Sequence, residues 1–241
     1  MNDAVKKFLE ATKLKNMGPT PYKKGKDAPP LETPCEGDRI ALPEAKSLEI
    51  PDISLRKAIT DRRSVRKYDD KPLSVEELSY ALWATQGVHK QTSGVTLRSV
   101  PSAGARHAFD TFLLINNVEG LKPGLYRYMA LEHALVPISL GEDYGVRLKE
   151  ACLGQKMVEN AAVTFVWAAN IYRMYYRYGE RGYRYIFLDA GHVSQNLYLV
   201  AEQLQCGTVA IAAYDDDAVN ALLGLDGTER FSVYIGTLGK R

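Results

Sequence analysis

Two basic clusters at opposite ends of the sequence could together bind a phosphate group. Arg62-Arg63-Ser64-Val65-Arg66 places three guanidiniums and one hydroxyl within five residues, and Lys240-Arg241 follows a predicted core strand. A dianionic phosphate is well matched by guanidinium forks, a hydroxyl donor and an ammonium point charge. The alternative for the first cluster is a solvated basic face, which runs of charge commonly form.

A third cluster is aromatic. The segment from Tyr172 to Tyr185 holds six tyrosines and four arginines. Tyrosine offers a flat amphipathic ring on which arginine can stack. The segment could therefore line a pocket for a planar ligand or a subunit interface, or it could simply pack a corner between two helices.

Other chemistries have little support in the sequence. The four histidines are scattered and none shares zinc-ligand spacing with a cysteine, so we expect no metal site. There is no GxSxG motif for a hydrolase nucleophile and no GxGxxG motif for a Rossmann-type nucleotide site. Gly236-Thr-Leu-Gly239-Lys240 has too few residues between its glycines to be a P-loop.

Helices and strands alternate irregularly around these clusters. Ser74-Val-Glu-Glu77 is a capping box that predicts a helix ending near Gly87, and apolar residues at steps of three and four predict the longest helix over about residues 183–205. Further helices are expected near residues 4–11, 55–61, 142–152 and 215–223, strands at 109–118, 161–169, 208–213 and 231–237, a hairpin at 125–138, and a polar loop at 89–94. Because the hairpin interrupts βαβ alternation, the pattern favours an α+β domain with a mixed sheet over a doubly wound fold.

Composition limits the class of protein further. The chain has 241 residues, of which 46% are hydrophobic, and 31 basic against 29 acidic side chains give a net charge of +2. Such a chain can bury a core, and it has no bulk charge to attract nucleic acid or a membrane surface. The apolar run at 161–169 is too short for a membrane span. Three widely separated cysteines and no visible signal peptide predict a cytoplasmic protein.

The first fifty residues differ from the remainder. They are rich in proline, and the stretch from Lys13 to Lys26 is basic. Such a stretch cannot hold long helices. We therefore predict an extended N-terminal segment over residues 1–50, running along a surface, and a single domain over residues 51–241. A mobile tail without a role is the alternative.

Several motifs resemble those of one flavoenzyme family. Arg62-Arg63-Ser64-Val65-Arg66-Lys67-Tyr68, with the capped helix after it, looks like the opening of FMN-dependent nitroreductase-family proteins. Ser102-Ala-Gly104, Val118-Glu-Gly-Leu-Lys-Pro-Gly-Leu-Tyr126, Tyr178-Gly-Glu-Arg-Gly-Tyr-Arg-Tyr185 and Asp189-Ala-Gly-His-Val-Ser-Gln-Asn-Leu197 are similar to its SagB/ThcOx-type dehydrogenase branch. The resemblance covers about Ser54 to Arg241. It implies an α+β fold with a mixed, largely antiparallel sheet flanked by helices, in a homodimer whose subunits share two active sites.

The resemblance also implies which residues surround FMN. The implied cofactor-binding positions are Arg62, Arg63, Ser64 and Arg66 at the phosphate and the pyrimidine edge, Pro101, Ser102, Ala103 and Gly104 from the other subunit, His107, Gln155, Ala212 and Ala213 near the ring, and Lys240 and Arg241 closing the phosphate site. Tyr185 is the candidate proton donor or acceptor beside the flavin N5, with Arg184 as its charged neighbour. Some azoline-oxidising relatives use a Lys-Tyr pair, which Arg184-Tyr185 does not reproduce because arginine keeps its proton at neutral pH.

These residues favour an FMN-dependent oxidoreductase. Hydride would pass by a ping-pong mechanism from NAD(P)H to a small conjugated acceptor such as a nitroaromatic or a quinone. The flavin would carry the redox chemistry and the protein would supply position and charge. Two alternatives stay open: an azoline or related heterocycle dehydrogenase that passes electrons through FMN to oxygen, and a flavin-binding protein without turnover.

Overall fold

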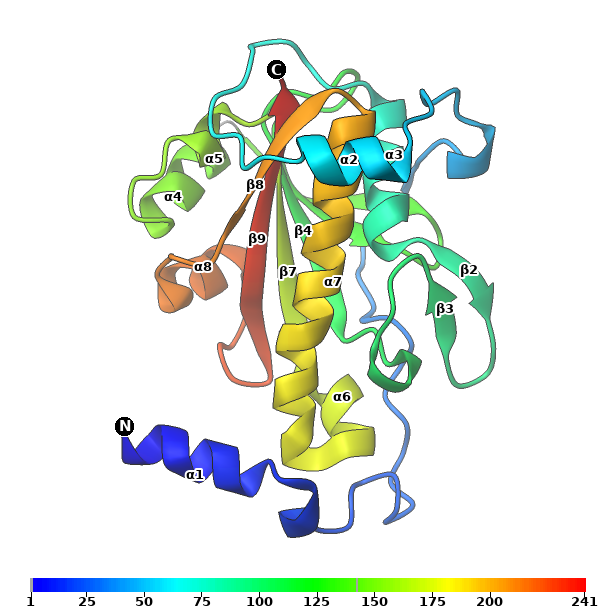
Figure 1. The fold of residues 1–241 in the computed structure, drawn as a ribbon, viewed down its shortest axis with the longest axis vertical. Helices are drawn as coiled ribbons and strands as arrows, with labels where there is room; N and C mark the ends of the chain where they lie inside the picture. Colours follow the sequence, from blue (N-terminus) through cyan, green and yellow to red (C-terminus); the bar gives the residue numbers. More distant parts are fainter. Residues whose placement is uncertain (1, 142) are drawn as a thin grey trace.

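A seven-stranded antiparallel sheet forms the centre of the fold (Figure 1). The computed structural model describes residues 2–141 and 143–241. The strand order is β1-β6-β5-β4-β7-β9-β8, and every neighbouring pair is antiparallel. The strands are β1 (Ile40–Ala41), β4 (Phe109–Ile115), β5 (Gly124–Met129), β6 (Ala134–Leu140), β7 (Val163–Asn170), β8 (Cys206–Ile211) and β9 (Arg230–Lys240). The predicted α+β class with a largely antiparallel sheet is confirmed, and the predicted hairpin is β5–β6.

Helices cover both faces of the sheet (Figure 1). Successive side chains of a strand point to opposite faces, so Leu113 packs into one apolar core and Leu114 into the other. The long apolar run at 161–169 follows from this, since β7 is buried on both sides. On one face lie α2 (Leu55–Asp61), α3 (Val75–Gln86) and α7 (Gly182–Gln203), and on the other α4 (Tyr144–Ala151), α5 (Met157–Asn160) and α8 (Asp216–Leu223).

The helix signals read from the sequence are confirmed for α3 and α7. The Ser74 Oγ accepts the Glu77 N–H at 3.2 Å and the Glu77 carboxylate accepts the Ser74 N–H at 2.9 Å, which is the reciprocal capping box. The apolar residues of α7 at steps of three and four, such as Ile186, Ala190 and Val193, are buried. No helix within the two described ranges has both the length and the apolar character needed to cross a bilayer.

The predicted polar loop at 89–94 is wrong for residues 89–91, which form a strand, and confirmed for residues 92–94, which form a turn. Those residues belong to a two-stranded hairpin of β2 (Val88–Gln91) and β3 (Thr96–Arg98). The hairpin stands apart from the main sheet and β2 is mostly exposed, so it lacks the apolar alternation by which strands are recognised. Its turn is closed by the Thr92 N–H, which donates to the Val95 carbonyl at 2.9 Å.

The N-terminal segment is held against the body of the molecule. It begins with the predicted short helix, α1 (Asp3–Ala11), and later contributes β1 at the edge of the sheet. The Glu32 carboxylate accepts the Ala130 N–H at 2.6 Å, and the Thr33 hydroxyl accepts a hydrogen bond from Arg173 at 2.7 Å. In the structure this segment is therefore extended and attached, whereas a domain boundary at residue 50 stays a prediction.

A buried ionic cluster joins strands β4 and β5 to α6 (Ile171–Tyr178). Asp110 on β4 lies 2.5 Å from Arg127 on β5 and 3.1 Å from Arg173 on α6, and all three side chains are at least 97% buried. Burial by itself would raise the pKa of Asp110, but the two guanidiniums outweigh it and hold that pKa below its usual range. The cluster is stable only while the carboxylate is ionised.

We expect Asp110→Asn to lower the free energy of unfolding by about 3–5 kcal/mol at neutral pH, because it leaves two buried guanidiniums without a countercharge. Because the pKa of Asp110 is lower in the folded state, its contribution to the free energy of unfolding is complete above the unfolded-state pKa of about 3.9. That contribution is lost as the pH falls through the folded-state pKa. The gap between wild type and variant should therefore close at low pH. Urea denaturation at several pH values measures it, with the exposed Asp143→Asn as control; a gap below about 1 kcal/mol at pH 7 would contradict the assignment.

Candidate active site

The backbone brings the two basic clusters of the sequence together. Ser64 pairs with Thr208 on β8, and the Val65 N–H donates to the Thr208 carbonyl at 2.9 Å. Four residues later the Asp69 N–H donates to the Lys240 carbonyl on β9 at 2.9 Å. The segment after α2 thus lies across the ends of the last two strands. Residues 62–66 and the C-terminal Lys240-Arg241 meet at one end of the sheet.

This crossing needs glycine in both strands. A Cβ on Gly207 would lie 2.5 Å from a methyl carbon of Val65, and one on Gly239 would lie 2.8 Å from the Tyr68 ring. Neither distance is possible for a real side chain without movement of the backbone. The two glycines therefore allow the Val65–Tyr68 stretch to pack directly on the strands.

The arginines of this segment differ in what they contact. The Arg62 guanidinium lies over the Tyr198 ring at 5.2 Å, and Arg63 donates to the carbonyls of Thr60 and Arg62 at 2.8 Å each. Arg66 is exposed and makes no ion pair with any described residue. Neither Arg63 nor Arg66 has a carboxylate partner among residues 2–141 and 143–241. Their charges are available to an anion.

Tyr198 on α7 is a site residue that the sequence did not reveal. Its hydroxyl accepts the Ala210 N–H at 3.0 Å and is hydrogen-bonded to the Ser64 hydroxyl at 2.9 Å. Because the oxygen already accepts from Ala210, its own proton is free to donate to Ser64. Tyr198 therefore ties the 62–66 segment to the outer edge of β8. Its only sequence signal was a hydroxyl-bearing residue within an otherwise apolar helix pattern.

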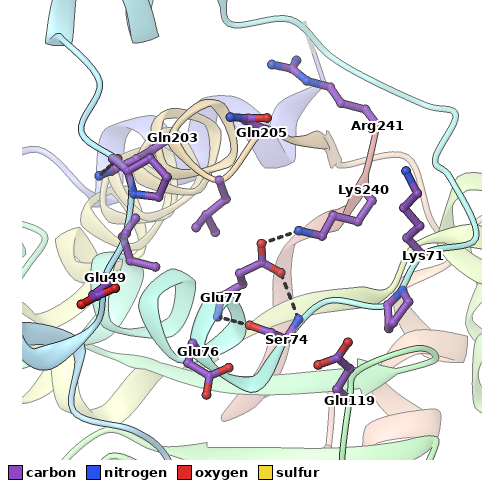
Figure 2. A pocket seen from close by; sticks show the side chains of 14 residues that line it. Glu49, Lys71, Ser74, Glu76, Glu77, Glu119, Gln203, Gln205, Lys240 and Arg241 are labelled. Carbon is purple, nitrogen blue, oxygen red and sulfur yellow. Dashed lines mark hydrogen bonds and ion pairs between the residues drawn. The ribbon is translucent and has the colours of Figure 1, made fainter.

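The side chains of Lys240 and Arg241 are each paired with a glutamate. Lys240 contacts Glu77, the same carboxylate that caps α3, and the Arg241 guanidinium lies 2.7 Å from Glu202. Figure 2 shows Lys240 pointing toward Glu77 in a pocket of about 770 Å³, with Arg241 pointing away from it. The Lys240 backbone is bonded to Asp69, three residues after the 62–66 segment, but the side chains of Lys240 and Arg241 are already paired with carboxylates. Their role at a phosphate stays a prediction.

A surface without bulky side chains follows β8. Ala212 and Ala213 are exposed, and Gln155 donates to the Ala213 carbonyl at 2.8 Å and to the Cys152 carbonyl at 2.9 Å. Gln155 is therefore committed to holding this turn in place. The turn presents backbone and methyl groups, which a flat ring could approach closely.

The loop from Pro101 to His107 packs against the first half of α7. The Asp189 carboxylate accepts the Ala103 N–H at 3.3 Å, and the Ser102 hydroxyl accepts the His107 N–H at 2.9 Å. Gly104 has a φ of +58°, and a Cβ there would lie 2.3 Å from the Tyr178 hydroxyl. Burial, with the nearby Arg98 charge, lowers the pKa of His107 to about 3, so its imidazole is neutral.

Tyr185 lies beside this loop, in contact with a different arginine from the one expected. Arg181 donates to the Tyr185 hydroxyl at 2.7 Å and its guanidinium lies 5.3 Å from the ring centre. Arg184 instead donates to the Thr12 hydroxyl at 2.6 Å and to the Leu9 carbonyl at 2.8 Å. Arg181 rather than the adjacent Arg184 contacts Tyr185, because side chains four residues apart lie on the same face of a helix.

The candidate residues thus form two groups within one protomer. Residues 62–66 and Tyr198 lie near the C-terminal part of α7, and Tyr198 is bonded to Ala210, two residues before the Ala212–Ala213 turn. The 101–107 loop and Tyr185 lie along the first half of the helix, where Ala103 is bonded to Asp189. Tyr185 and Tyr198 are 13 residues apart, which is about 20 Å along a helix. Between them α7 exposes Phe187 and Leu188, at 58% and 61%.

Comparisons with known proteins identify the family and the fold. The model of the Nitroreductase family matches residues 59–240. A protein of Methanocaldococcus jannaschii whose name describes it as a nitroreductase is 36% identical, over 76% of this chain and 88% of its own. The trifolitoxin-processing protein TfxB of Rhizobium leguminosarum is 30% identical over 65% of this chain, which spans only 38% of TfxB. A Ralstonia eutropha structure titled as a nitroreductase superposes with a TM-score of 0.69 at 24% identity, over 84% of this chain and 89% of that one.

The match over residues 59–240 identifies the chain as an oxidoreductase. Its fold is an antiparallel sheet flanked by helices. The chain belongs to the nitroreductase family, and its relatives include a SagB-type processing protein.

We expect Tyr198→Phe to loosen the attachment of the 62–66 segment to β8, because it removes the oxygen shared by Ser64 and Ala210. Losing these hydrogen bonds lowers the free energy of locally detaching the segment by about 1 kcal/mol, which corresponds to roughly fivefold faster amide exchange. Hydrogen exchange at the Ala210 and Val65 amides measures this, with Tyr144→Phe on the opposite face as control. Unchanged exchange at both amides would show that Tyr198 does not hold the segment.

Proposed function

We propose that the protein is a homodimeric, FMN-dependent oxidoreductase that passes hydride by a ping-pong mechanism from NAD(P)H to a small conjugated acceptor. The observation that carries this proposal is the pairing of the 62–66 segment with Thr208 on β8, the strand that leads four residues later into the unobstructed Ala212–Ala213 turn. Unpaired guanidiniums there suit a phosphate monoester, and the turn suits the edge of a flat ring.

The residues fit FMN better than a dinucleotide. Arg63 and Arg66 lack carboxylate partners in the described chain, and Ser64 offers an exposed hydroxyl oriented by Tyr198. A pyrophosphate and adenosine would normally require a dedicated nucleotide motif, and the sequence contains none. We assign the phosphate to Arg62, Arg63, Ser64 and Arg66, and the ring to the Ala212–Ala213 turn.

The second half of each site would come from the partner subunit. Tyr185 lies about 20 Å along α7 from Tyr198, which is bonded to β8, so we infer that it serves a ring held in the partner subunit rather than one at Ala212 of its own protomer. Two α7 helices packed antiparallel about a twofold axis would place the first group of one chain against the second group of the other. The exposed Phe187 and Leu188 between the groups provide an apolar surface for that contact.

The flavin, when bound, supplies the hydride-accepting and hydride-donating ring. The guanidiniums of residues 62–66 hold its phosphate and add positive charge at the site. The methyl-sized side chains of Ala212 and Ala213 leave room for a donor or acceptor to approach the ring. Tyr185, hydrogen-bonded to Arg181, is proposed to deliver a proton to the acceptor. A kcat of Tyr185→Phe within twofold of wild type would leave that proton to water.

A heterocycle dehydrogenase that passes electrons through FMN to oxygen is the second candidate. The 30% identity to the trifolitoxin-processing protein TfxB favours it. The Arg184-Tyr185 pair argues against an acid–base role of the kind described for Lys-Tyr pairs, since Arg184 keeps its proton and is bound to the N-terminal segment. A flavin-binding protein without turnover is a further outcome of the same experiments.

Three measurements on the purified protein test the proposal. Acid release of the chromophore and mass determination should give FMN, and finding FAD or no flavin would refute the proposed FMN-dependent activity. Anaerobic mixing with NADH or NADPH should bleach the flavin, and a quinone or nitroaromatic should restore it. Sedimentation at micromolar concentration should give a dimer, whereas a monomer with full flavin occupancy would exclude a shared site.

We expect Arg66→Ala to weaken FMN binding by about ten- to a hundredfold, because it removes a charge-assisted hydrogen bond of roughly 1.5–3 kcal/mol. Titration of flavin-free protein, followed by flavin fluorescence, measures the affinity. Arg147→Ala is the matched control, since Arg147 lies on α4 on the opposite face of the sheet. Equal affinities in wild type and Arg66→Ala would identify this residue as part of a solvated face.

A further inference from the structure

Four arginines without a carboxylate partner among the described residues lie on the end of α6, the start of α7 and the 101–107 loop. The junction of α6 and α7 is at the bottom of the molecule in Figure 1. We call Arg106, Arg177, Arg181 and Arg184 the arginine corner. In residues 2–141 and 143–241, the arginines that do form ion pairs are all elsewhere: Arg39, Arg127, Arg147, Arg173, Arg230 and Arg241. The corner therefore carries uncompensated positive charge.

Two of the four guanidiniums lie at the 101–107 loop. Arg106 donates to the Gly94 carbonyl at 2.6 Å and to the Gly104 carbonyl at 3.3 Å, both of them neutral acceptors. The exposed Arg177 lies over the Tyr22 ring at 5.4 Å. Partial burial and the nearby Arg177 charge lower the pKa of Arg106, as expected for like charges held close together.

The other two guanidiniums are also bound only to neutral groups. Arg181 donates to Tyr185 and, at 2.9 Å, to the Thr12 carbonyl. Arg184 donates to the hydroxyl of Thr12 and to the Leu9 carbonyl. These bonds attach the end of α1 to α7, but they do not cancel either charge.

The arginine corner borders the residues that we place opposite the partner's flavin. Gly104 lies against the Tyr178 hydroxyl and close to the Arg177 side chain, where its added Cβ would be 3.4 Å from Arg177 Cδ. The rings of Tyr178 and Tyr185 meet edge to face at 4.9 Å. A substrate resting on these rings would have its edge beside Arg106 and Arg177.

We propose that the arginine corner binds an oxyanion, a carboxylate or a phosphate, carried by a substrate of the flavin site. This inference rests on the proposed function, because it needs the 101–107 loop at that site. Guanidiniums match both oxyanions in geometry and charge, so the anion could belong to the acceptor or to the 2′-phosphate of NADPH. The positive field would also raise the local concentration of an anionic substrate.

Paired probes that differ in charge test this inference. We would compare 4-nitrobenzoate with 4-nitrobenzamide as acceptors and NADPH with NADH as donors. Equilibrium dialysis of each probe against the purified protein gives Kd independently of turnover, and steady-state kinetics gives KM. The variants are Arg106→Gln and Arg177→Gln, and Arg147→Gln on α4 is the control.

We expect both variants to weaken the more negatively charged member of one pair by about tenfold in Kd and KM, while the other member of that pair changes less than twofold. Loss confined to 4-nitrobenzoate places the anion on the acceptor, and loss confined to NADPH places it on the donor. Unchanged values, or equal losses for the two members of each pair, would overturn the inference. Turnover of 4-nitrobenzamide with unchanged anion binding would refute this inference alone, whereas absence of flavin and turnover would refute the proposed function.

Discussion

The hydrogen bond from the Val65 N–H to the Thr208 carbonyl sets the geometry on which the candidate site depends. It fixes the residues after α2 on the edge of β8, where an unpaired strand would otherwise expose its polar groups. Tyr198 and the glycines at 207 and 239 support the same crossing, the first by hydrogen bonds and the others by lacking a side chain. Through it, residues separated by about 175 positions in the sequence meet at one end of the sheet.

Helix α7 acts as a rigid spacer between the two groups of candidate residues. Its core-facing side is fixed by packing on the sheet, and its outer side carries the exposed Phe187 and Leu188. A helix of fixed rise keeps Tyr185 and Tyr198 about 20 Å apart. Under the proposed function, this separation is bridged by a site built from two chains.

Arginine has two distinct uses in this protein. Arg127 and Arg173 are buried and paired with Asp110, where leaving either unpaired would cost several kcal/mol. Arg106 and Arg177 lie at the surface beside the 101–107 loop and have neutral or aromatic partners. The first pair stabilises the fold, whereas the second leaves charge available to a ligand.

The sequence by itself determined the α+β class, the capping box at Ser74, the course of α7 and the basic residues at 62–66, because these depend on local propensity and on short-range spacing. It did not reveal the β2–β3 hairpin, since the exposed strand β2 carries no apolar alternation and the buried residues of β3 are the polar Thr96 and Arg98. Helical spacing also accounts for the contact between Arg181 and Tyr185, which lie four residues apart. Only the tertiary structure decided that Lys240 is paired with Glu77 and that Tyr198 joins Ser64 to Ala210. Those contacts depend on how distant elements pack together, which no local pattern encodes.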